Sequence, residues 1–162
     1  MTSAPHSTTA RQLALIDQLR DRPFPARHGL AATAGGVPGD PVRSVPGGHV
    51  AQLWEGPPLW DADPADAEEI REECAAGLAA LTAVLSLRWG PPTVVELAGR
   101  LERLAWGLPV RPPLDLLCGQ VARVHTWQAG GRWVAIGAGQ GGPELPYRLL
   151  AAIGEGTVEE VP

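Results

Sequence analysis

The strongest helical signal in the chain covers residues 64–88, PADAEEIREECAAGLAALTAVLSLR, and it constrains the fold more than any other segment. Asp63 stands where an N-cap is expected and Pro64 at the first helical position. Gly90, followed by two prolines, ends the segment. Apolar residues recur at helical spacing: Ile70, Cys74, Leu78, Leu81 and Leu85. The pattern predicts a long helix that buries one face.

Several segments have the alternation and β-branched content of strands. HVAQLWEG (49–56) and TVVEL (93–97) are short examples. VARVHTWQAGGRWVAIGAG (121–139) predicts a β-hairpin that turns at Gly130 and Gly131. Because hairpin strands run antiparallel, we expect a mainly antiparallel sheet of about four strands.

Three shorter helices are expected after residue 97. AGRLERLAWG (98–107) would face Leu101, Leu104 and Ala105 inward, and PPLDLLCG (112–119) would form a short helix. ELPYRLLAAIG (144–154) would close the fold as a helix, with an apolar face made by Leu145, Leu149, Leu150 and Ile153. The fold class predicted is α+β, with the helices over 64–88 and 144–154 on one face of the sheet.

The N-terminal part divides into an arm and a linker. Residues 1–20 contain a marginal helix whose narrow apolar stripe, Leu13, Ile16 and Leu19, must dock on the body or fray. Proline and glycine recur so densely over 21–48 that we predict a flexible linker there. Residues 49–156 would form a single α+β domain, followed by the tail 157–162.

Charge and composition exclude some classes of partner. The formal net charge is −5, and the 13 basic residues are all arginines without a run of them. Nucleic-acid binding needs a concentrated basic surface, so no nucleic acid is expected. Neither a signal-peptide pattern nor a membrane-length apolar run is seen, which predicts a cytoplasmic protein without a membrane partner. Cys74 and Cys118 have apolar neighbours and are expected to be buried thiols.

Gly137, Gly139 and Gly142 spell G-x-G-x-x-G, the pattern of a dinucleotide-binding loop. That loop belongs to a parallel βαβ unit, whereas here the preceding strand is the second arm of a hairpin and little chain follows. With 20 glycines in 162 residues, a chance match is easy. We therefore interpret the cluster as a connection, expect no cofactor, and keep small-ligand or nucleotide binding through 137–142 as the alternative.

Catalytic and metal-binding patterns are weak in this sequence. The histidines lack metal-site spacing, and no catalytic residue is assigned. Cys118 and His125 form the best candidate pair for thiol chemistry, but the thiol lies at an apolar helix end, where ionisation is disfavoured.

The six tryptophans suggest a different role. Trp127 and Trp133 flank the predicted hairpin turn and would pair across it. If exposed near Arg132 and Arg148, they would form a protein-binding patch, because tryptophan and arginine concentrate binding energy at interfaces. Packing in the core is the competing interpretation.

The segments SLRWGPPTVVEL, GRWVAIGAGQ and ELPYRLLAAIGEG resemble those of small uncharacterised α+β proteins of actinobacteria. The resemblance covers residues 49–156 and implies the domain boundaries, without an active site to transfer.

These observations favour a non-enzymatic protein-binding module, of the immunity-protein or adaptor kind, whose partner is another protein. A homo-oligomer is compatible with them. An enzyme using Cys118 and His125 is the third hypothesis.

Overall fold

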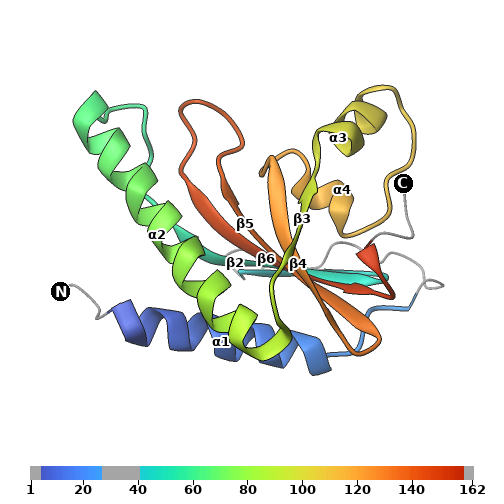
Figure 1. Ribbon diagram of the computed structural model, residues 1–162. Helices are drawn as coiled ribbons and strands as arrows, with labels where there is room; N and C mark the ends of the chain where they lie inside the picture. Colours follow the sequence, from blue (N-terminus) through green and yellow to red (C-terminus); the bar gives the residue numbers. More distant parts are fainter. Residues whose placement is uncertain (1–4, 27–40, 159–162) are drawn as a thin grey trace.

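The computed structural model describes residues 5–26 and 41–158, in which an antiparallel sheet has helices on both of its faces (Figure 1). The sheet has six strands in the order β1-β2-β6-β5-β4-β3. Its strands are β1 Val42–Val45, β2 Gly48–Glu55, β3 Thr93–Glu96, β4 Arg123–Ala129, β5 Arg132–Gly139 and β6 Arg148–Glu155. The helices are α1 Pro5–Asp21, α2 Pro64–Trp89, α3 Ala98–Ala105 and α4 Leu114–Leu117. The predicted α+β class with a mainly antiparallel sheet is confirmed.

Each face of the sheet carries its own apolar core. On the face covered by α1 and α2, here called the α2 face, Ile16, Leu81 and Ile153 are fully buried. On the opposite face, the α4 face, Leu97 and Leu117 pack with residues of the strands. Since side chains alternate along a strand, neighbouring residues of β6 enter different cores.

The predicted closing helix over 144–154 is wrong, because Arg148–Glu155 forms the central strand β6 between β2 and β5. Both faces of β6 are covered, and residues 149–154 are all buried. A strand buried on both faces reads as a continuous apolar run, which periodicity does not distinguish from a buried helix. The chain between Gly139 and Arg148 therefore joins two antiparallel strands.

The sheet begins earlier in the chain than predicted. Val42–Val45, inside the segment assigned to the linker, forms edge strand β1 and pairs with β2. Residues 27–40 of the predicted linker lie outside the described residues. Proline and glycine flank β1 and do not interrupt it, so the strand fits between them.

Helix α1 docks on the body. Ile16 and Leu19 of its predicted stripe are fully buried in the core of the α2 face. Asp17 also pairs with Arg88 of α2, with an N···O distance of 2.9 Å. Tertiary burial supplies the stability that so narrow a stripe lacks in isolation.

Helix α2 is confirmed, and it forms for the local reasons read from the sequence. The Asp66 amide donates to the Asp63 side chain at 2.9 Å, and Pro64 occupies the first turn. Cys74, Leu81 and Leu85 are the buried residues of the helix. At the other end, Gly90 has a φ of 84°, which a glycine adopts without strain.

A buried histidine joins the end of α1 to strands β1 and β2. The His49 ring is fully buried, with Nε2 3.1 Å from the Arg22 carbonyl and Nδ1 2.7 Å from the Ser44 hydroxyl. A carbonyl accepts only, so Nε2 carries the proton and Nδ1 accepts from Ser44. Burial lowers the pKa of His49 below its usual 6.5. The ring is neutral in the folded protein.

We expect this histidine to destabilise the fold in mild acid. The unfolded chain takes up the His49 proton as the pH falls through 6.5, whereas the folded chain takes it up at lower pH, so stability falls between the two pKa values. Thermal unfolding measured from neutral pH downward should show the loss, and His49→Gln should flatten it. An unchanged slope in His49→Gln would contradict the assignment.

Candidate functional site at strand β3 and helix α3

Helix α3 turns its apolar side to solvent. It lies wholly within the described part of the chain, and none of its residues is buried. Leu101 and Leu104 are 46% and 37% exposed, whereas Arg100 and Arg103 are less exposed than these leucines. The prediction that Leu101, Leu104 and Ala105 face inward is therefore wrong, since all three are exposed.

Further exposed apolar side chains lie near both ends of α3. Trp106, directly after the helix, is 74% exposed, and Leu108 is 42% exposed. Val94, in the preceding strand β3, is 48% exposed, and its side chain lies on the α2 face of the sheet, next to that of its cross-strand partner His125. The β3–α3 surface is defined here by five side chains: Val94, Leu101, Leu104, Trp106 and Leu108.

Strand β3 leaves one edge of the sheet open. It is the last strand in the order, and among the described strands its one partner is β4. The Leu97 amide donates to the Ala122 carbonyl at 2.9 Å, in register with the β3–β4 pairs, so Thr93, Val95 and Leu97 direct their backbone groups toward β4. In an antiparallel ladder the alternate residues point the other way. Val94 and Glu96 therefore present their backbone N–H and C=O groups at the open edge.

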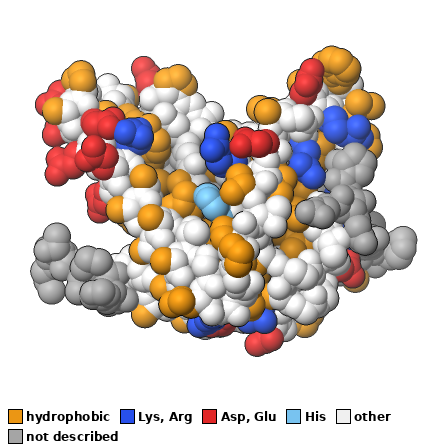
Figure 2. All heavy atoms as spheres, viewed as in Figure 1, with side chains coloured by type: hydrophobic (Ala, Val, Ile, Leu, Met, Phe, Trp, Pro, Cys, Tyr) orange, Lys and Arg blue, Asp and Glu red, His pale blue; other side chains and the backbone are white. Residues whose placement is uncertain are grey.

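The edge carries little net charge. Glu96 lies 3.5 Å from Arg123 of the neighbouring strand, and both side chains are more than 60% exposed. An ion pair as exposed as this one adds little stability, but its two opposite charges cancel at the edge of the sheet. Figure 2 shows a hollow between two projections, with acidic side chains gathered on the α2 side and both apolar and basic side chains on the α3 side.

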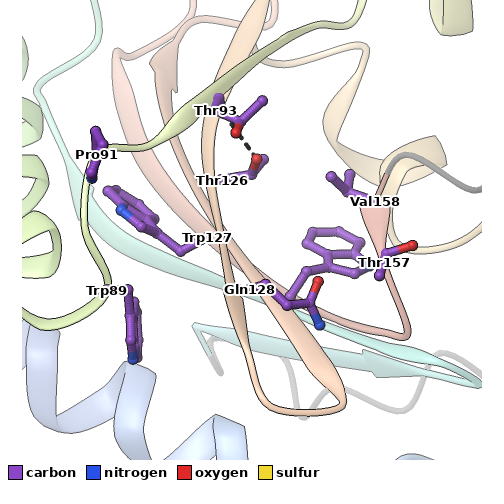
Figure 3. A pocket seen from close by; sticks show the side chains of 9 residues that line it. Trp89, Pro91, Thr93, Thr126, Trp127, Gln128, Thr157 and Val158 are labelled. Atoms are coloured by element: carbon purple, nitrogen blue, oxygen red, sulfur yellow. Dashed lines mark hydrogen bonds between the residues drawn. The ribbon is translucent and has the colours of Figure 1, made fainter.

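A cavity of about 360 Å³ opens at the start of β3, mainly on the α4 face (Figure 3). Its rim includes Pro91 and Thr93, and the Thr126 hydroxyl donates to the Thr93 carbonyl there at 2.9 Å. The lining residues are Trp89, Pro91, Thr93, Thr126, Trp127, Gln128, Trp133, Thr157 and Val158. The cavity and α3 thus lie at opposite ends of β3.

Trp127 and Trp133 do not form the predicted surface patch. Each is 4% exposed, and they belong to the cores of opposite faces, so they do not pair across the turn. Trp127 donates from Nε1 to the Gly90 carbonyl at 2.9 Å, while the Trp133 ring lies against Gly154. Both are packing residues, and the exposed tryptophans of the described chain are Trp60 and Trp106.

Arg132 and Arg148 are engaged within the protein. Arg132 donates to three carbonyls at the end of α1, at 2.7 to 3.2 Å, and its guanidinium lies 3.9 Å from the Phe24 ring centroid. Arg148 pairs with Glu55 at 3.3 Å and donates to the Gln120 side chain. These contacts give both arginines structural roles.

The glycine pattern has a packing explanation. Gly137 and Gly139 lie in β5, and Gly142 lies in the connection to β6, with no helix after it. A Cβ at Gly139 would lie 2.5 Å from the Gln120 carbonyl oxygen, and one at Gly137 would lie 2.9 Å from a neighbouring carbonyl oxygen. Glycine is needed there because the backbone of residues 120–123 passes so close.

Cys118 and His125 are not brought together. Cys118 lies in the core of the α4 face, whereas His125 is on the same face of β4 as Trp127 and lines a hollow with α2. Burial raises the pKa of the Cys118 thiol and also that of Cys74. Neither thiol is activated for nucleophilic chemistry.

Over residues 5–26 and 41–158, no three potential metal ligands cluster together. Within the same part of the chain, no helix combines the length and apolar character needed to cross a membrane. Comparison with known protein families, with curated proteins and with solved structures finds no match for this chain.

The sequence pattern did not identify the residues of the β3–α3 surface, because it does not show which side of an amphipathic helix packs against the rest of the protein. Leu101 and Leu104 have the spacing of core residues. One available signal is Trp106 immediately before Gly107, a large aromatic at a helix end where burial is incomplete.

Proposed function

We propose that this protein is a non-enzymatic protein-binding module of the cytoplasm, of the immunity-protein or adaptor kind, and that it binds its partner through the β3–α3 surface. The observation that carries the proposal is the orientation of α3. Its leucines face solvent while its arginines lie closer to the body. In an isolated monomer this orientation leaves apolar side chains exposed to water, where they add little stability. Burying the same side chains against a partner would stabilise a complex.

The composition of the surface supports the proposal. Trp106 offers a large aromatic side chain that is 74% exposed. Tryptophan is enriched among the residues that dominate binding energy at interfaces. The open edge of β3 adds backbone donors and acceptors, which a partner strand can use.

The competing functions lack a comparable arrangement. Nucleotide binding through 137–142 needs a helix N-terminus at the loop, whereas the chain there continues into β6. Thiol catalysis needs Cys118 and His125 on one side of the sheet, and they lie on opposite sides.

A pair of exposed tryptophans allows a matched test. Trp106 is 74% exposed and Trp60 is 71% exposed, so alanine at either position should leave folding nearly unchanged. We expect Trp106→Ala to weaken capture of a stoichiometric partner by about 30-fold, as for an interface residue worth about 2 kcal/mol. Trp60→Ala should capture the partner normally. Equal capture by both variants and the wild type would refute the proposed surface.

A further inference from the structure

We infer that the β3–α3 surface binds a second copy of this chain, with the two β3 strands paired antiparallel across a two-fold axis. The inference rests on the proposed function, because it names the partner of the same surface. Its starting point is the open edge, where Val94 and Glu96 present backbone groups with no hydrogen-bond partner among the described residues.

One pairing register of the two β3 strands gives a hydrogen-bond partner to every outward N–H and C=O group of Val94 and Glu96. With Val95 opposite its own copy, Val94 pairs with Glu96 of the second copy and Glu96 with Val94, and each pair exchanges both N–H···O bonds. Shifting the register one way sets Glu96 opposite Pro92, which has no N–H. Shifting it the other way sets Glu96 opposite itself, and like charges directly opposite are destabilising.

The same register brings α3 to the cavity at the start of β3. Residue 98, the first of α3, then lies opposite residue 92 of the second copy. Helix α3 contacts α4 and follows buried Leu97, so it lies on the α4 face. The cavity beside Pro91 and Thr93 opens mainly on that face. The exposed apolar side of α3 and the cavity are thus the two halves of one contact, made twice by the two-fold axis.

Charge and area agree with a second copy as the occupant. The Glu96–Arg123 pair neutralises the edge, so two copies of it do not repel. A strand of four residues is far too small to supply the roughly 800 Å² per partner of a stable interface. The contact of α3 with the cavity would have to supply the rest of the interface.

The register predicts which engineered cysteines form a disulfide. Val95 faces itself across the axis at a distance suited to a disulfide, whereas Thr93 faces residue 97. In the full chain under oxidising conditions, we expect Val95→Cys to form a covalent dimer and Thr93→Cys to form little. Cys74 and Cys118 are buried and should not interfere.

Sedimentation measures the association directly. The wild type should be dimeric at high-micromolar concentration, and Val94→Pro should weaken the dimer about tenfold or more by removing an outward N–H from each edge. Proline is tolerated in an edge strand where its N–H would face solvent. Val94→Thr keeps the donor and is the control. If Val94→Pro fails to fold, the comparison of the two cysteine variants decides the register.

The outcomes separate this inference from the proposed function. A wild type that stays monomeric at high-micromolar concentration overturns the second copy, while the Trp106 and Trp60 comparison still decides whether the surface binds another protein. Equal covalent dimer from Val95→Cys and Thr93→Cys also overturns it. A dimer unaffected by both Val94→Pro and Trp106→Ala uses a different surface and overturns this inference, while the capture comparison of Trp106→Ala with Trp60→Ala still tests the proposed function.

Discussion

Replacing Gly154 with alanine should destabilise the fold by on the order of 3 kcal/mol, at the upper end of the cost of overpacking a core. A Cβ at this position would lie 1.9 Å from the Trp133 ring, which is 4% exposed and packed on the α4 face. Gly154 and Trp133 are direct partners in the β5–β6 ladder, so neither backbone can move away without disturbing the central strands. Urea denaturation measures the loss.

The control for this substitution is Gly99→Ala. Gly99 lies in α3, and a Cβ there meets nothing within 4 Å. Alanine in an exposed helix should be neutral or stabilising by up to about 1 kcal/mol. If the two variants unfold at the same urea concentration, the close packing of Trp133 on Gly154 is contradicted.

Arg132→Met should destabilise the fold by about 2 to 3 kcal/mol, because one guanidinium nitrogen serves three carbonyls at the end of α1. The same guanidinium lies over the Phe24 ring at 3.9 Å, and that contact is lost too. We expect α1 to open first, so hydrogen exchange at the amides of Ile16 and Leu19 should accelerate more than exchange in β6.

Arg88→Met is the matched control for Arg132. Arg88 also ties α1 to the body, through Asp17, but both side chains of that pair are about 40% exposed. An exposed ion pair contributes about 1 kcal/mol or less. Equal losses in the two variants would show that the carbonyl contacts of Arg132 do not hold α1 in place.

Elements whose signals are local can be predicted from the sequence. Asp63, Pro64 and Gly90 mark the limits of α2, and the structure places the helix between them. The glycines at 130 and 131 mark the β4–β5 turn, where Gly130 has a φ of 71°. Caps and turns depend on residues adjacent in the chain, so a single sequence contains the physics that forms them.

Tertiary structure alone decided what each apolar residue meets. Residues 149–154 became a strand because β2 and β5 enclose them, and Trp127 and Trp133 became core residues because the sheet is covered on both faces. Leu101 and Leu104 face solvent although their spacing fits a core helix. Burial depends on neighbours that are distant in the chain, and periodicity does not identify those neighbours. The candidate site was therefore identified from the tertiary structure, whereas the strand and helix that form it were predicted from the sequence.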